Sequence, residues 1–192
     1  MADPALDIPR MSAAEYLQME KQATWKHEFV NGVVYARAGA SRRHNTIAQN
    51  VSRALGDRLS PPCQIYSLEV KVHRLSASEK QFYYPDGVVT CSDLDTDEDL
   101  VKFPSLVVEV ISKSTESADR GYKFDDYKKL LSVQEYVLVH QSRACVEVYR
   151  RRTEWLKEVF ETDATITLKS VQVTVPVAAF YQRVTLAAAG DS

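Results

Sequence analysis

The sequence predicts a single mixed α/β domain in which helices pack against a β-sheet. Helical and strand-like segments alternate along the whole chain, which is typical of this class. The segment 106–139 has the pattern strand, helix, strand, which predicts a right-handed parallel crossover. The length of 192 residues, with 45% hydrophobic and 26% charged residues, suits one globular domain. We assign residues 1–11 to an N-terminal tail and residues 12–188 to the domain.

Local signals place the elements of the N-terminal half. A capping box, Ser12-Ala13-Ala14-Glu15, predicts the start of a short helix. Asn31-Gly32 favours a type I′ turn, which predicts a β-hairpin over residues 25–35. Apolar residues at helical spacing predict a helix over 41–59, ended by Pro61-Pro62. We also expect strands at 64–67, 69–75 and 81–90, with a polar turn at 76–80.

The C-terminal half contains the most apolar segment. Residues 104–111 are largely β-branched and predict a strand buried on both faces. A helix is expected over 116–131, with a buried stripe of Phe124, Tyr127, Leu130 and Leu131. The remaining expected elements are a strand at 134–140, a hairpin at 145–160, one or two strands within 166–175, and a short helix at 177–184.

Composition limits the function and the cellular location. The net charge of −2 gives no general attraction to nucleic acid, so binding would need a local basic patch. The three cysteines, Cys63, Cys91 and Cys145, form no CxxC pair, which argues against a disulfide framework and indicates a reducing compartment. No signal peptide is recognisable, and no apolar run approaches the ~20 residues of a membrane span. We expect a cytoplasmic protein without membrane partners.

Two carboxylates interrupt the apolar strands. Asp86 follows Pro85 and precedes Val88-Val89, and Glu109 lies inside the strand 104–111. Burying a carboxylate is costly unless a cation or hydrogen-bond donors compensate it. Together the two acids could bind Mg²⁺ or Mn²⁺, and Lys123 could orient water or stabilise charge on a phosphate. Alternatively, Asp86 caps a turn and Glu109 pairs with an internal lysine or arginine.

Other polar features leave alternatives open. Glu28 lies on the first strand of the predicted hairpin, where local sequence favours a solvent-facing side chain. The polar face of the helix at 41–59 could follow a phosphate backbone or could simply be solvated. The residues of that face that we consider for nucleic-acid binding are Arg42, Arg43, Asn45 and Gln49. The acidic run 93–99 lacks the glycine and glutamate of a calcium loop, so we expect a solvated loop.

The ordered set of motifs resembles the PD-(D/E)XK nuclease superfamily and, within it, the Uma-type restriction endonuclease family. The resemblance covers about residues 12–150. Its motifs are Glu28 with Asn31-Gly32, Tyr84-Pro85-Asp86, Val108-Glu109-Val110, Ser114-Thr115, Asp119, Lys123, Tyr127 and Glu135-Tyr136. The resemblance implies a restriction-endonuclease-like fold, with a central mixed β-sheet flanked by helices, added β-hairpins and a divalent metal.

The resemblance also assigns residue roles. It makes Asp86 and Glu109 catalytic metal ligands, adds the backbone carbonyl of Val110, and has Glu28 close the metal site. The superfamily lysine falls at position 111, where this chain has isoleucine. In related families the following helix supplies this lysine, which points to Lys123. Lys113 is the competitor, but it is expected beyond the end of the strand.

The implied function is an endonuclease dependent on Mg²⁺ (or Mn²⁺) that hydrolyses phosphodiester bonds in DNA. Cleavage of both strands of a duplex would favour a homodimer. The alternative is a non-catalytic nuclease-fold module that binds nucleic acid or a protein partner. The isoleucine at position 111 and the near-neutral charge favour this alternative. A third possibility is a structural α/β domain with an internal ion pair.

Overall fold

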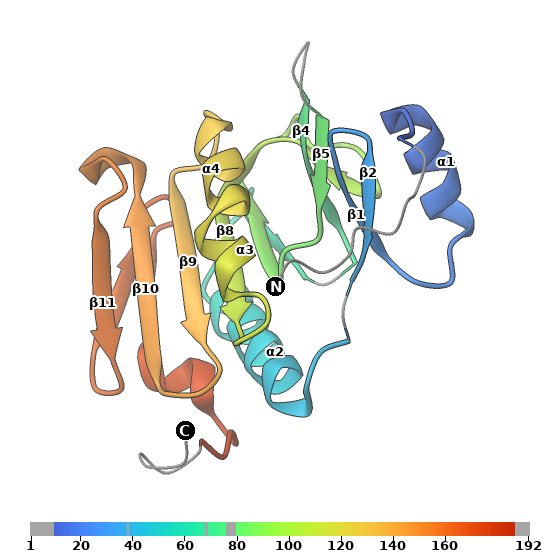
Figure 1. Cartoon of the computed structure of the whole chain (residues 1–192). Helices are drawn as coiled ribbons and strands as arrows, with labels where there is room; N and C mark the ends of the chain where they lie inside the picture. The colour runs from blue at the N-terminus through green and yellow to red at the C-terminus, as the bar shows by residue number, and fades with distance from the viewer. Residues whose placement is uncertain (1–9, 38, 68, 76–79, 187–192) are drawn as a thin grey trace.

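The computed structural model describes residues 10–37, 39–67, 69–75 and 80–186, and within them two β-sheets and a separate hairpin are flanked by helices (Figure 1). The six-stranded sheet has the order β11-β10-β9-β8-β6-β3. Its strands are β3 (Gln64–Tyr66), β6 (Gly87–Thr90), β8 (Pro104–Ile111), β9 (Glu135–His140), β10 (Cys145–Arg150) and β11 (Lys157–Glu161).

The second sheet has five strands in the order β2-β1-β5-β4-β7. Its strands are β1 (His27–Val30), β2 (Val33–Ala36), β4 (Lys71–Leu75), β5 (Lys80–Tyr83) and β7 (Leu100–Val101). The separate hairpin pairs β12 (Thr165–Leu168) with β13 (Val173–Pro176). The helices are α1 (Ala13–Gln22), α2 (Arg42–Gly56), α3 (Glu116–Arg120), α4 (Tyr122–Lys129) and the 3₁₀ helices η1 (Arg151–Thr153) and η2 (Val177–Tyr181).

Local sequence signals explain several element boundaries. The predicted capping box is present at α1, where Ser12 and Glu15 bond each other's backbone N–H groups. The hairpin β1–β2 turns at Asn31 (φ 48°) and Gly32 (φ 95°), the positive φ angles that a type I′ turn requires. At α2, the Ser41 hydroxyl accepts a hydrogen bond from the N–H of His44. These predictions are confirmed.

The predicted crossover forms the centre of the larger sheet. β8 and β9 are parallel neighbours, and α3 and α4 connect them across one face of the sheet (Figure 1). β8 is buried on both faces, as predicted. Leu106, Val108 and Val110 belong to the core cluster that includes α2. Val107 and Ile111 belong to a second cluster that includes Tyr127 of α4 and Tyr136 of β9, and Glu109 alternates with them on that same face.

The helix expected over 116–131 is wrong as a single helix, because Gly121 divides it into α3 and α4. Gly121 has φ −100° and ψ −115°, and its N–H donates to the carbonyls of Ser117 and Ala118. A Cβ at this position would lie 2.7 Å from the Ser117 carbonyl oxygen. The end of the predicted stripe is also wrong: α4 stops at Lys129, and Leu131 is 82% exposed.

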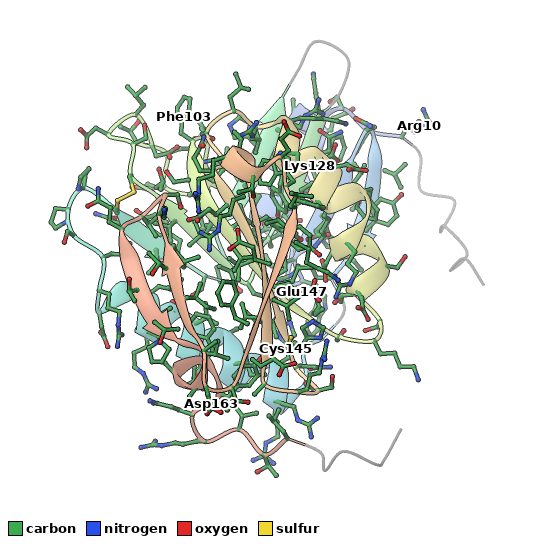
Figure 2. All side chains as sticks on the ribbon, turned by 90° about the vertical axis from the view of Figure 1, so that its left-hand side faces the viewer. Arg10, Phe103, Lys128, Cys145, Glu147 and Asp163 are labelled. Carbon is green, nitrogen blue, oxygen red and sulfur yellow. A yellow bond between two sulfur atoms is a disulfide. The ribbon has the colours of Figure 1, made fainter. Side chains whose placement is uncertain are left out.

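The expectation about the cysteines is also corrected, because Cys63 and Cys91 form a disulfide, the yellow bond in Figure 2. β3 pairs antiparallel with β6, and Gln64 lies opposite Thr90. Cys63 directly precedes Gln64 and Cys91 directly follows Thr90, so both cysteines lie at the same end of this ladder. Cys145 is a buried free thiol. The cysteine pattern therefore no longer supports a reducing compartment.

Smaller differences concern the ends and loops of the chain. The short helix expected at 177–184 is the 3₁₀ helix η2. Most of the predicted tail and polar turn, residues 1–9 and 76–79, lies outside the described residues. In the acidic loop, the Asp95 carboxylate accepts hydrogen bonds from the N–H groups of Lys102 and Phe103. No helix of the described segments is long and apolar enough to cross a bilayer.

Candidate active site

A cleft of about 460 Å³ opens where the two sheets and three helices meet. Residues of β1 and β2, of α3 and α4, and of the start of α2 line it. The carboxylates of the cleft come from β1, the β5–β6 connection, β8 and α3. The acidic and basic residues that line it are Glu28, Arg37, His44, Asp86, Glu109, Asp119 and Lys123.

Asp86 and Glu109 are buried, and each carboxylate accepts a hydrogen bond from a backbone N–H of the other segment. The N–H of Asp86 donates to Oε2 of Glu109 across 3.3 Å, and the N–H of Val110 donates to Oδ2 of Asp86 across 2.8 Å. The antiparallel pairing of β6 with β8 places Gly87 opposite Val108, which sets this register. The two carboxylates are therefore fixed side by side at one edge of the strand pair.

Lys123 provides a buried ammonium group within this acidic cluster. Its Nζ lies 2.8 Å from Oε1 of Glu28, 3.7 Å from Oε1 of Glu109 and 3.7 Å from Oδ1 of Asp119. Burial acts to lower the pKa of Lys123, but the charges of these three acids outweigh it and raise the pKa above its usual value. Lys123 is therefore protonated at neutral pH.

This cluster holds more carboxyl groups than ammonium groups, and the pKa values of two of its carboxyl groups are raised. Burial raises the pKa of Glu109 well above its usual value, and repulsion from Asp119, Asp86 and Glu28 adds to the effect, while Lys123 opposes it. Burial likewise raises the pKa of Asp119. A positive charge placed among these groups would stabilise their ionised forms.

A tyrosine donates to the same glutamate. The Tyr127 hydroxyl donates a hydrogen bond to Oε1 of Glu109 across 3.4 Å. Burial and the charge of Glu109 raise the pKa of Tyr127 well above its usual value, so this hydroxyl keeps its proton. Glu109 is thus oriented by a backbone N–H on one oxygen and by a phenol on the other.

Two basic residues that sequence reasoning missed contact Asp86. Nε2 of His44 lies 3.1 Å from Oδ2 of Asp86, and a guanidinium nitrogen of Arg37 lies 3.6 Å from Oδ1. Burial acts to lower the pKa of His44, but the hydrogen bond and charge of Asp86 outweigh it and raise the pKa. No local pattern marks either residue, because only the path of the chain into α2 brings them to the cleft.

Asp119 was part of the recognised motif but had no assigned role. Its spacing of four residues from Lys123 is the available signal, since residues four apart share a face in the single helix that the sequence predicts. A partly buried network connects α3 to the larger sheet: Arg120 makes two hydrogen bonds to Glu147 of β10, which also contacts His140 and Tyr149. Burial acts to raise the pKa of Glu147, but these hydrogen bonds outweigh it and lower the pKa to about 2. Figure 2 labels Glu147 on its strand.

The structure separates the two lysine candidates. Lys113 is exposed beyond the end of β8 and does not line the cleft, whereas Lys123 is buried within it. Ile111 lies on the same face of β8 as Glu109 but packs in an apolar cluster. Glu28 is buried and bound to Lys123, so the solvent-facing alternative is wrong.

The predicted nucleic-acid-binding residues lie on α2, outside the cleft lining. Arg42 and Gln49 are exposed, Arg43 and Asn45 are half-buried, and Gln49 donates to Asn45. Ser41 and His44 are the residues of this segment that line the cleft. The predicted residues are therefore neighbours of the candidate site rather than part of it.

The donor chemistry fits a hard divalent cation, because several carboxylates line the cleft. Within the described ranges, no group of three or more acidic, histidine or cysteine side chains is arranged to hold a metal ion. Mg²⁺ often takes only one or two carboxylates and fills its remaining positions with water. Asp86, Glu109 and the Val110 carbonyl suit that smaller set, whereas Glu28 is engaged by Lys123.

The mixed α/β fold is shared with a solved structure. A crystal structure titled as a putative nuclease belonging to DUF820, from Anabaena variabilis, superposes with a TM-score of 0.68 and 16% sequence identity. The superposition covers 90% of this chain and 98% of that one. At this identity the comparison shows the fold.

This chain belongs to the Uma2 family, described as putative restriction endonucleases, which it matches over residues 13–178. Two uncharacterized proteins of Synechocystis sp. are relatives. The protein slr1290 is 31% identical over 183 residues, covering 93% of this chain and 95% of its own. The protein sll1609 is 38% identical over 156 residues, covering 76% of this chain and 85% of its own.

Proposed function

We propose that this chain is an endonuclease dependent on Mg²⁺ or Mn²⁺ that hydrolyses phosphodiester bonds in DNA. The observation that carries the proposal is the arrangement of Asp86 and Glu109, two buried carboxylates held side by side in an open cleft with Lys123 near Glu109. The family description makes DNA the proposed substrate.

Each residue would have a distinct task. Asp86, Glu109 and the Val110 carbonyl would hold the metal, which when bound lowers the pKa of water and polarises a phosphoryl oxygen. Lys123, which is protonated, would orient the attacking water and stabilise negative charge on the phosphate. Glu28 holds Lys123 in position, and it would have to exchange this contact to join the metal ligands.

A homodimer would allow both strands of a duplex to be cut. Two copies related by a two-fold axis present identical sites to the two antiparallel strands. Sedimentation or light scattering at micromolar protein concentration would measure the assembly state. A monomer that remains a monomer on duplex DNA would contradict this part of the proposal.

The competing function is a non-catalytic module that binds nucleic acid or a protein partner. Two observations favour it: position 111 holds a buried isoleucine, and no group of three metal-ligating side chains is found among the described residues. This module would bind DNA with an affinity that does not depend on Asp86, and it would leave the strands intact.

Plasmid nicking in Mg²⁺, Mn²⁺ or EDTA distinguishes the two functions. We expect nicking with either metal and none in EDTA, and we expect Asp86→Asn to abolish it. Asp93→Asn, which changes an exposed acid of the loop at 93–99, is the matched control and should retain full activity. Nicking that persists undiminished in Asp86→Asn would refute the proposed site. Binding without nicking under all conditions would favour the module.

A further inference from the structure

Two exposed tyrosines lie on the rim of the cleft. Tyr35 is 46% exposed and Tyr122 is 48% exposed, and both line the same cleft as Asp86 and Glu109. Partly exposed aromatic rings are ordinary when they occur singly. Two of them bordering one polar cleft, on elements far apart in the chain, need a separate explanation.

The fold fixes both tyrosines next to the central ion pair. Tyr35 is the direct cross-strand partner of Glu28 in the β1–β2 hairpin, so the two side chains lie on the same face of the sheet. Tyr122 is the first residue of α4 and directly precedes Lys123. Because Lys123 and Glu28 are 2.8 Å apart, the ion pair holds the two tyrosine-bearing segments against each other.

The surroundings of Tyr122 agree with this placement. Its ring centroid lies 6.3 Å from that of Tyr83, which supports one side of the ring. Burial raises the pKa of Tyr122, and the charge of Glu28 and the phenol of Tyr35 add to this effect, while Lys123 opposes it. Tyr35 and Tyr122 thus line one cleft from two different segments of the chain.

The other exposed aromatic residues of the described chain differ in position. Trp25 and Phe103 are both exposed but line no part of the cleft, and Figure 2 shows Phe103 on a loop at the top of the molecule. Arg37 and His44 lie beside Asp86 in this cleft, and the guanidinium of Arg37 places positive charge there. Aromatic faces next to cations are the combination that binds single strands.

We propose that Tyr35 and Tyr122 form a stacking site for an unpaired nucleobase next to the phosphate that lies over Asp86 and Glu109. The inference rests on the proposed function and narrows it to DNA with an unstacked base, such as a single strand, a flap or a flipped nucleotide. Every base presents a π-face to an aromatic ring, so this binding tolerates any sequence. Inside a duplex these faces are covered by the neighbouring base pairs.

Binding measured without metal tests this site independently of cleavage. The probes are a fluorescein-labelled single-stranded 12-mer, the same strand with abasic positions at its centre, and a blunt duplex, each titrated in EDTA by fluorescence anisotropy. We expect the intact single strand to bind at least about 10-fold more tightly than the abasic strand, because the abasic strand loses base stacking but keeps its phosphates.

The variants Tyr35→Ala and Tyr122→Ala should each weaken single-strand binding about 10-fold and leave abasic-strand binding unchanged. Tyr35→Phe and Tyr122→Phe keep the ring and should bind as the wild type does. Phe103→Ala, which removes an exposed ring away from the cleft, is the control and should change nothing. Thermal unfolding of each variant verifies that the fold is intact.

Several outcomes would overturn the inference. These are wild-type affinity in both alanine variants, equal losses for the single strand and the abasic strand, and tighter binding of the duplex with no dependence on either tyrosine. Absence of any single-strand binding would overturn it as well. Failure of the nuclease proposal is seen separately, as cleavage that is missing or indifferent to Asp86, and it would leave ring-dependent binding in place.

Discussion

Lys123 of α4 donates a hydrogen bond to Glu28 of β1 across 2.8 Å, although 95 positions separate them in the chain. The contact joins the smaller sheet to the helices that cover the larger one. It also places an ammonium group near Glu109 while position 111 of β8 remains apolar. Glu28 of the β1–β2 hairpin thus holds the ammonium group of Lys123 in place, whereas β8 supplies no cation at position 111.

Replacing Lys123 with methionine should destabilise the protein strongly. The substitution keeps much of the side-chain volume but leaves Glu28, Glu109 and Asp119 without their shared cation. Removing one partner of a buried pair typically costs about 3–5 kcal/mol. Urea unfolding of the variant measures this loss.

Glu28→Gln is the matched variant for this test. If the two groups interact as the structure shows, the double variant Lys123→Met/Glu28→Gln loses less stability than the sum of the single variants, by about 0.5–3 kcal/mol. Strict additivity would show that the ion pair does not contribute to stability.

Glu109→Gln should stabilise the protein at pH values above the usual pKa of a glutamate. Burial raises the pKa of Glu109 in the folded state, so the folded protein holds this proton more tightly than the unfolded chain does. The associated stability is complete below about pH 4.3 and is lost as the pH rises through the folded-state pKa. The neutral amide removes this loss, while Lys123 keeps Glu28 and Asp119 as partners.

Urea unfolding at pH 4 and pH 8 measures this effect. We expect a gain on the order of 1 kcal/mol at pH 8 and little change at pH 4. Added Mg²⁺ should reduce the difference in stability between Glu109→Gln and the wild type at pH 8, because a cation stabilises the ionised glutamate of the wild type. A loss of stability that is equal at both pH values would contradict the explanation.

Gly121→Ala should distort the junction between α3 and α4. A Cβ would lie 2.7 Å from the Ser117 carbonyl, so the backbone must shift and Lys123 would move with α4. We expect a loss of about 1–3 kcal/mol, measured by urea unfolding. Gly39→Ala is the control, since no atom lies within 4 Å of its Cβ position, and it should change stability by no more than about 0.5 kcal/mol.

Thiol titration of the unfolded chain tests the disulfide. Of the three cysteines, Cys63 and Cys91 are bonded and Cys145 is free, so one thiol should react without reductant and three with it. Cys63→Ser should lower the free energy of unfolding by about 2–4 kcal/mol, because the unfolded chain loses a cross-link. Three reactive thiols in the untreated protein would contradict the pairing.

Sequence reasoning located the parts of the site that interrupt a local pattern. Asp86 and Glu109 are visible because each interrupts an apolar run of the sequence, and the crossover that carries Glu109 follows from the order of elements. The assignment of Lys123 came from the family motif, and its metal-related role remains a prediction. His44 and Arg37 could not be found, since nothing near them in the sequence indicates Asp86 as a neighbour.

Two of the structural errors have related causes. The break at Gly121 was missed because one glycine is tolerated inside a helix and the apolar spacing continues beyond it. The disulfide was missed because cysteine spacing does not reveal which strands pair. Both features depend on contacts between segments, namely the close approach of the Ser117 carbonyl and the register of β3 with β6.

The burial of β8 on both faces determines how precisely its glutamate is positioned. A slip of one residue would turn Glu109 toward the apolar cluster of α2 and would turn Val108 or Val110 toward Lys123. The apolar packing around Leu106, Val107 and Ile111 therefore fixes the register of β8 and, with it, the position of Glu109. Substitutions that loosen this strand should misplace the carboxylate even when they leave every polar residue unchanged.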